Sequence, residues 1–414
     1  MSETSTTRSL TALVIGNILG GIGVASGIAV GALLVATMGG TGMSGLGQAL
    51  SVLGAGLLAV PLAKLATQRG RRRALATGYV IAAIGGLIVL IGARLDALVV
   101  VLLGLLLFGA AQATNLQTRY AASELATPAR RATIMSIVIW ATTIGSVAGP
   151  NLSTAGASLG RPLGIPDLAG PYLFSVTGFI LAFAVIALVF VRRSATAGTG
   201  PSAPPQSAGR KMGAMAALRW AAAHPVARFA VVLIVTGHAV MVGIMSMTPV
   251  HLGHGGHGLQ IIGLTISLHI MGMYALSPVV GWLADRFGPM RVALAGLIQF
   301  AVVAVIILIE ADHFVGVVIA LILLGTGWSC TTIAGSALLA SVDSGEVRVP
   351  LQGATDALMN YGAATAALLG GPLLALIGYG GLALVSALVI IPAGAIGWYA
   401  RRHRDSALAA RDQR

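Results

Sequence analysis

Twelve apolar runs dominate this sequence, and each is long enough to cross a lipid bilayer as a helix, which takes about 20 residues. Hydrophobic residues make up 57% of the chain and charged residues only 9%. A water-exposed surface could not be covered with so few charges, so the bilayer must be the solvent. The runs fall at 10–37, 45–66, 74–94, 97–119, 132–153, 171–191, 228–251, 259–282, 291–311, 313–338, 352–376 and 380–399. We therefore predict an all-α membrane protein with twelve transmembrane helices.

The positive charges indicate how these helices are oriented. Of the 25 Lys and Arg residues, only Arg94 and Arg161 fall outside if the chain starts on the cytoplasmic side. Cytoplasmic loops normally carry this excess, so we predict cytoplasmic N- and C-termini. The net charge of +13 is thereby explained as an orientation signal, and we expect the lipid bilayer, and no nucleic acid, as a partner. The expected location is the bacterial cytoplasmic membrane, where the chain would be a multi-pass protein and a monomer.

The first apolar run and the cysteine content argue against a cleaved signal peptide and two kinds of cysteine-dependent structure. The first apolar run is long enough to span and has no small-residue cleavage site behind a short core, so we interpret it as a retained helix. Cys330 is the single cysteine, which excludes an internal disulfide and a cysteine-cluster metal site.

A Gly, Pro, Ser and Ala-rich segment divides the spans into two sets of six. We predict an N-terminal six-helix bundle at 1–193 and a flexible cytoplasmic linker at 194–227. A C-terminal six-helix bundle would follow at 228–400, with a cytoplasmic tail at 401–414.

The two halves repeat each other in sequence. "AKLATQRGRRRAL" follows the second run and "GWLADRFGPMRVAL" follows the eighth, which places Gly70 and Gly288 at equivalent points. A Gly-Pro pair recurs in the fifth and eleventh runs, at 149–150 and 371–372. Near-equal offsets in the same run of each half indicate a duplicated six-helix unit.

The segment "GWLADRFG" resembles the loop signature of the major facilitator superfamily. This resemblance implies two bundles that rock around a central site, giving alternating access to the two sides of the membrane. It also implies a gate at Asp285, Arg286 and Gly288, where the Asp carboxylate would hold the cytoplasmic side shut through contact with a helix N-terminus. The first-half copy has Thr67 where the signature has Asp, so the equivalent contact there is in question.

Charged groups are scarce inside the predicted spans. Arg119 lies at the inner end of the fourth run and Asp356 near the inner end of the eleventh, and no carboxylate lies at mid-membrane. Buried ionisable groups usually mark proton relays or charged cargo. Their scarcity argues against a drug antiporter driven by a mid-membrane carboxylate.

Soft metal ligands occupy two neighbouring runs instead. Met241 and Met245 are spaced i, i+4 in the seventh run, and His269 and Met273 share that spacing in the eighth. Met241 and His269 each lie about 15 Å from the outer end of their run, so we expect all four side chains to form a ladder around mid-membrane. Methionine is also ordinary filler in apolar interiors, and a lone histidine can bond a backbone carbonyl.

Thioether with imidazole suits Cu(I), whereas zinc prefers more nitrogen or thiolate. His251, His254 and His257, in the loop above the ladder, form a possible metal vestibule; the alternative is a Gly-rich loop with incidental histidines.

The Met-x-x-x-Met and His-x-x-x-Met pairs also resemble the CcoA-like copper importers, a branch of the same superfamily. That resemblance implies Met241, Met245, His269 and Met273 as ligands of copper, carried as substrate, with no cofactor and no enzymatic activity. Cysteines of some members of that branch are missing here. Three alternatives stay open: an importer of a small organic solute such as riboflavin, a drug or metabolite exporter, and a metal sensor that does not transport.

Overall fold

The computed structural model describes residues 3–40, 43–191, 212–256, 259–311, 313–342 and 345–412, and long helices fill most of this length. The first half holds α1 (Glu3–Gly39), α2 (Ser44–Arg69), α3 (Arg71–Arg94), α4 (Leu98–Ser123), α5 (Arg131–Asn151), α6 (Ser153–Gly160) and α7 (Tyr172–Val189). The second half holds α8 (Ala214–Ala223), α9 (Pro225–His254), α10 (Leu259–Tyr274), α11 (Ser277–Phe287), α12 (Pro289–Glu310), α13 (Phe314–Ala340) and α14 (Gly345–Asp412). Short 3₁₀ turns at Pro128–Arg130 and Arg161–Leu163 complete the elements.

The described helices confirm the predicted membrane-spanning architecture. Ten helical segments within the described residues are long and apolar enough to cross a bilayer, and the last of them, Glu346–Arg402, is long enough to cross twice. Its two crossings meet at Gly378, whose φ of 70° and ψ of −178° are not helical. With α5 included, these elements account for the twelve predicted spans. Leu188 and Ile309 are examples of large apolar side chains exposed on the outside of the bundle, as a lipid solvent requires.

The eighth span is divided between α10 and α11 rather than running as one helix. Pro278 lies in the first turn of α11. Proline has no N–H and its ring clashes with the carbonyl four residues earlier, so it begins a helix well but cannot continue one. The break falls at Ala275 and Leu276, immediately before this proline.

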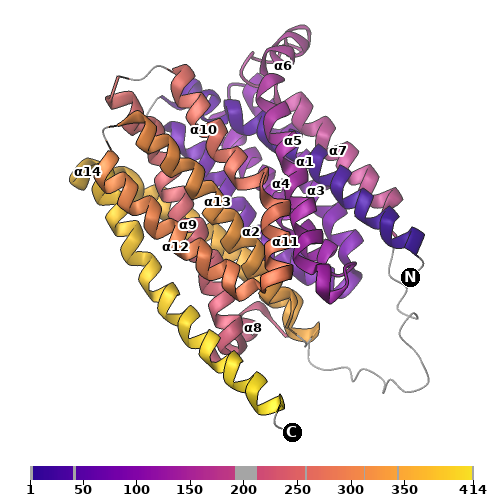
Figure 1. The fold of residues 1–414 in the computed structure, drawn as a ribbon. Helices are drawn as coiled ribbons and strands as arrows, with labels where there is room; N and C mark the ends of the chain where they lie inside the picture. Colours follow the sequence, from indigo (N-terminus) through magenta and orange to yellow (C-terminus); the bar gives the residue numbers. More distant parts are fainter. Residues whose placement is uncertain are drawn as a thin grey trace.

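The two halves lie side by side, and each has an apolar core of its own (Figure 1). The first core is built largely from α1, α3, α4 and α7, and the second from α9 to α14. The start of α1, helix α8 and the end of α14 all lie at one end of the molecule, which we call the inner end (Figure 1). Helix α6 lies at the opposite, outer end, where Arg161 forms an exposed ion pair with Asp167 at 2.8 Å.

The segment expected to be a flexible linker, 194–227, contains regular structure in its second part. Residues 194–211 lie outside the described residues, but α8 covers Ala214–Ala223 and α9 already begins at Pro225. The α8 sequence is rich in alanine, the strongest helix former, and its Ala217 and Ala221 share one face that is buried. Helix α14 likewise continues through 401–412, the segment expected to be a tail.

The predicted internal repeat has a matching backbone feature. Gly70, between α2 and α3, has φ 85°, and Gly288, between α11 and α12, has φ 89°. L-residues with a side chain rarely adopt such angles, so both turns depend on glycine for a short connection between long helices. The equivalent turns therefore share a conformation as well as a sequence position.

Replacing Gly288 by alanine should destabilise the protein by about 1–3 kcal/mol, because a Cβ is strained at this φ even though the surrounding space is open. Thermal unfolding in detergent or lipid nanodiscs measures the effect as a lowered Tm. Gly213→Ala is the matched control, since Gly213 has an ordinary φ of −81° and open space around it. Equal Tm values for the two variants would contradict this account of the turn.

Candidate functional site: polar contacts between the two halves

Asp285, one of the three predicted gate residues, lies against the first turn of α5. The Asp285 carboxylate, near the end of α11, accepts hydrogen bonds from the backbone N–H of Ala132 at 3.0 Å and of Thr133 at 2.8 Å. The Thr133 hydroxyl donates a third bond at 2.7 Å. The first N–H groups of a helix have no partner within the helix and carry partial positive charge, so a carboxylate stabilises them. Asp285 therefore joins α11 of the second half to α5 of the first.

The other two gate residues support this loop without crossing to the first half in the described contacts. The Arg286 guanidinium lies 5.9 Å from the centre of the Trp282 ring, on its own helix. Gly288 forms the turn that follows. Of the three predicted gate residues, Asp285 is the one that makes the contact between halves.

At the equivalent turn of the first half, a different residue makes the contact with the other half. Thr67 stands where the signature has Asp, and its hydroxyl donates to the carbonyl of Lys64 in its own helix. Arg71, the first residue of α3, instead forms an ion pair with Glu124 at 2.9 Å and donates to the side chain of Gln352 on α14 at 2.7 Å. A guanidinium has several donors in a fixed plane, so one side chain can hold two partners.

A buried ion pair also connects the two halves. Arg119 of α4 donates to Asp356 of α14 at 2.6 Å, and each side chain is only 1% exposed. Arg119 also donates to the hydroxyl of Tyr120 at 3.1 Å. The sequence predicted that both charged residues lie near the inner ends of their spans, but it did not predict that they form a pair. They are separated by 237 positions, and nothing in the local sequence links them.

Aromatic residues of the second half lie near this ion pair. The indole N–H of Trp328, on α13, donates to Nδ1 of His238, on α9, at 2.8 Å. Tyr274, at the end of α10, meets the Trp328 ring edge-on at 5.5 Å between centres. The Arg119 charge acts on both His238 and Tyr274. His238 was not among the predicted site residues, although it is an isolated histidine within an apolar span, which is the same signal that identified His269.

Several buried polar atoms in this region have no protein partner. They include Oδ2 of Asp356, Oδ1 of Asn360 and two guanidinium nitrogens of Arg119. Buried polar atoms are nearly always hydrogen-bonded in folded proteins, to protein or to ordered water. The inner interface between the halves therefore has spare hydrogen-bonding capacity at its most buried charges.

The four predicted metal ligands are placed on two helices that barely touch. Helix α13 packs extensively against both α9 and α10, while α9 and α10 make few contacts with each other. Met241 and Met273 are 3% and 6% exposed and belong to the apolar core of the second half, and Met245 is half-buried against it. His269 is fully buried, its Nδ1 lies 2.7 Å from the carbonyl of Leu321 on α13, and its Nε2 has no partner.

Of the three histidines predicted to form a metal vestibule, two lie within the described residues. Nε2 of His251 lies 2.7 Å from the carbonyl of Ala311, and its ring stacks on Tyr379 at 4.3 Å. His254 is the last residue of α9, and His257 lies outside the described residues. Across the part of the chain that the structure describes, no group of three or more His, Cys, Asp or Glu side chains could hold a metal ion.

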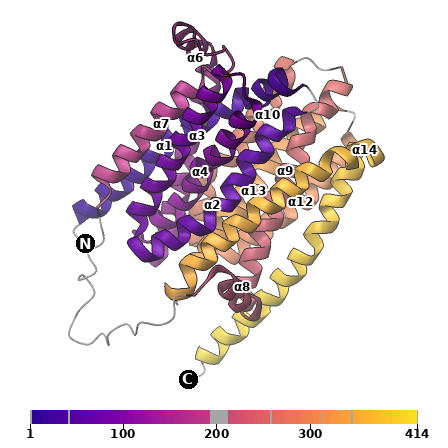
Figure 2. The same ribbon diagram turned by 180° about the vertical axis from the view of Figure 1, so that it is seen from behind.

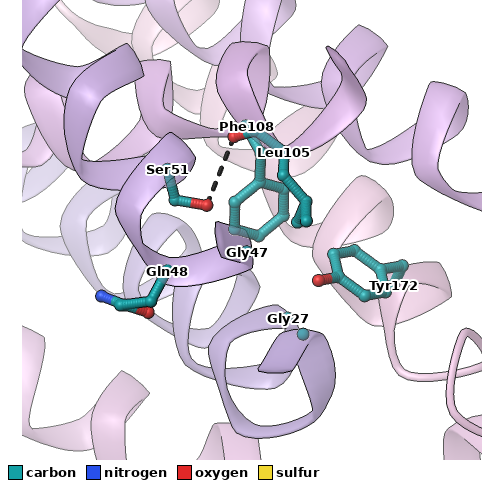
Figure 3. Close-up of a pocket in the computed structure, with 8 residues that line it drawn as sticks. Gly27, Gly47, Gln48, Ser51, Leu105, Phe108 and Tyr172 are labelled. Atoms are coloured by element: carbon teal, nitrogen blue, oxygen red, sulfur yellow. Dashed lines mark hydrogen bonds between the residues drawn. The ribbon is translucent and has the colours of Figure 1, made fainter. Parts of the chain in front are cut away.

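A small pocket occurs within the first half, away from these contacts. Figure 3 shows Phe108 and Tyr172 on one side of it and Ser51 and Gln48 on the other, with Gly27 completing the wall. The Ser51 hydroxyl is bonded to the carbonyl of Leu105, and the Tyr172 hydroxyl has no partner. The open space holds about one water molecule, so it cannot accommodate an organic solute.

Sequence comparison finds relatives among bacterial transporters. The chain is 35% identical to the uncharacterized MFS-type transporter YddS of Bacillus subtilis over 406 residues, covering 97% of this chain and 92% of that protein. It is 30% identical to the riboflavin transporter RfnT of Brucella anthropi over 326 residues, covering 78% and 77% of the two chains. Neither is described as a copper carrier, so the resemblance to the CcoA-like branch finds no support in these relatives.

The fold agrees with solved transporter structures. The crystal structure of the human organic anion transporter MFSD10 superposes with a TM-score of 0.73 at 14% identity, covering 95% of this chain and 99% of that one. The sequence model of the Major Facilitator Superfamily matches residues 13–273 and 256–413, which together span nearly the whole chain. This chain belongs to the major facilitator superfamily and is a multi-pass membrane transporter, not an enzyme.

Proposed function

We propose that this transporter imports a small organic solute of the riboflavin type by alternating access between its two halves. The observation that carries the proposal is the group formed by His238, Tyr274 and Trp328, which lies within electrostatic reach of Arg119. Aromatic faces with a few placed polar groups are typical of sites for planar organic ligands. The similarity to a riboflavin transporter favours the same class of cargo.

Copper is the rival cargo, and the arrangement of the four soft ligands gives it less support. Met241 and Met273 belong to a close-packed apolar core, and their helices are each packed on α13 rather than on one another. Methionine in such surroundings fills space well without a metal. One observation favours a ligand at His269: its Nε2 atom is buried and has no hydrogen-bond partner. Copper uptake is therefore measured beside riboflavin uptake in the transport experiment.

Cells without their own riboflavin uptake system should accumulate labelled riboflavin when they express this chain, with an initial rate that saturates as concentration rises. The same cells should contain no more copper, measured by mass spectrometry, than cells with an empty vector. Copper accumulation without riboflavin uptake would contradict the proposal and restore the Met241/His269 interpretation.

Trp328→Phe should weaken uptake of riboflavin, because it removes the indole N–H that orients His238 and part of the aromatic surface. We expect the concentration for half-maximal uptake to rise about tenfold, which corresponds to about 1.4 kcal/mol. Trp398→Phe is the matched control, since Trp398 is 56% exposed near the end of α14. An unchanged concentration dependence in Trp328→Phe would show that this group does not bind the cargo.

We further propose that Asp285 stabilises the closed state of the inner end. Its hydrogen bonds to Ala132 and Thr133 form only while α11 contacts α5. They therefore stabilise the conformation in which the inner end is closed. Arg71 with Gln352 would serve the first half in the same way.

Asp285→Asn should slow transport while leaving cargo affinity unchanged, because it removes the negative charge from the start of α5 but leaves the interior intact. A carboxylate at a helix start contributes about 1 kcal/mol, so the uptake rate should fall about fivefold. Asp96→Asn is the control, since Asp96 lies in an exposed outer turn with φ 51°, which asparagine also tolerates. Loss of cargo binding with a normal uptake rate would contradict the assignment.

A further inference from the structure

Helix α13 carries several hydroxyl side chains inside the second half, and two of them differ from the others. Thr326 and Thr331 donate to carbonyl oxygens three or four residues earlier in their own helix, as threonine within a helix often does. Ser329 and Thr332 are 0% and 1% exposed, and their hydroxyls have no hydrogen-bond partner among the described residues. The helix therefore presents two buried hydroxyls that it does not use itself.

These two hydroxyls lie on a face of α13 that is directed toward the first half. Ser329, Thr332 and Ser336 are spaced i, i+3 and i+7, so they share one side of the helix. Ser336 lies beside the hydroxyl of Tyr120 on α4, and Ala340, one turn further, packs against the same tyrosine. Seen from the side of α2 and α14, α13 lies behind these two helices (Figure 2). The face therefore belongs to the interface that opens and closes in alternating access.

The row of hydroxyls begins at the aromatic group of the second half. Trp328 directly precedes Ser329, and Thr332 follows Trp328 by four residues, so about one helical turn separates the indole from an unpartnered hydroxyl. Tyr274 meets the Trp328 ring edge-on at 5.5 Å between centres. The stretch from Trp328 to Ser336 is therefore aromatic at its outer end and hydroxylic toward its inner end.

Buried hydroxyls without partners indicate a ligand of matching chemistry. Leaving a buried polar atom unbonded costs free energy, which alanine or valine at the same position would not cost. A serine or threonine hydroxyl both donates and accepts, as the hydroxyls of a polyol do. Ser329 and Thr332 are about 4.5 Å apart along the helix axis, so one chain of hydroxyls can reach both. A phosphate chain would require cations, and the nearby Arg119 is already paired with Asp356.

We propose that Ser329 and Thr332 bind the polyhydroxyl chain of a cargo whose planar ring lies against His238, Tyr274 and Trp328. This assignment rests on the proposed function and deepens it, because it names the cargo as a heteroaromatic ring that carries an uncharged polyol chain. Riboflavin is such a molecule. Lumiflavin has the same ring with a methyl group in place of the chain, so a comparison of the two isolates the contribution of the hydroxyls.

Binding of the two flavins to the purified protein in lipid nanodiscs is measured through quenching of flavin fluorescence. The parent protein should bind riboflavin about 25-fold more tightly than lumiflavin, because two neutral hydrogen bonds each contribute a factor of about five. Thr332→Val and Ser329→Ala should each weaken riboflavin binding about fivefold and leave lumiflavin binding unchanged. The double variant should bind both flavins equally.

Thr331→Val is the matched control, since it makes the same substitution one position away and the Thr331 hydroxyl is bonded within its own helix. It should keep the parental preference for riboflavin. Thermal unfolding gives a second readout: Thr331→Val should lower Tm, because a bonded hydroxyl is lost, whereas Thr332→Val should not. A lowered Tm in Thr332→Val with unchanged riboflavin binding would overturn the assignment, since the hydroxyl would then serve the fold alone.

Equal affinity of the parent protein for riboflavin and lumiflavin would overturn the assignment and leave the proposed function standing. This outcome needs no variant. A preference for riboflavin that persists in the double variant would overturn it as well, because other groups would then bind the chain. Binding of neither flavin would contradict the proposed function itself, and the polyol subsite with it. The two proposals can therefore be told apart when either fails.

Discussion

The structure depends on one constraint, which is that the hydrocarbon core of a membrane offers no hydrogen-bond partners. Every backbone N–H and C=O inside it must be bonded within the chain, and long helices satisfy this requirement locally. Irregular backbone occurs at the turns between helices, as at Gly70 and Gly288, and at the break in the eighth span that precedes Pro278. The same constraint explains why polar side chains in the spans bond to nearby carbonyls, as Thr114 does to Ala110 and Thr355 to Leu351.

Charges inside a membrane protein cost free energy, so the few that are buried usually have a specific partner or a function. At the inner end, the polar contacts that join the halves include Asp285 with the start of α5, Arg71 with Gln352, and Arg119 with Asp356. The first two lie at equivalent corners of a duplicated fold but use different chemistry. A carboxylate at a helix start forms one, and a guanidinium bonded to an amide forms the other. The duplication preserved the position of the contact and not its residues.

The two cargo hypotheses differ in what they require of the second half. A copper path requires thioethers and imidazole to converge from α9 and α10, whereas an organic solute requires aromatic surface with a few polar atoms. Helix α13 packs against both of the other helices and contributes Trp328 next to His238. That arrangement supports the organic solute, as does the similarity to a riboflavin transporter.

The sequence by itself determined the membrane class and the superfamily, and it predicted twelve spans in two repeated halves. These follow from run length, composition and local motifs, which act over short stretches of chain. The resemblance to the superfamily's loop signature also implied that Asp285 contacts the N-terminus of another helix, because that signature is a local motif. Only the tertiary structure decided that Arg119 meets Asp356 and that Trp328 meets His238. Those partners lie on different helices, and periodicity within one helix gives the depth of a side chain but not the neighbour that it faces.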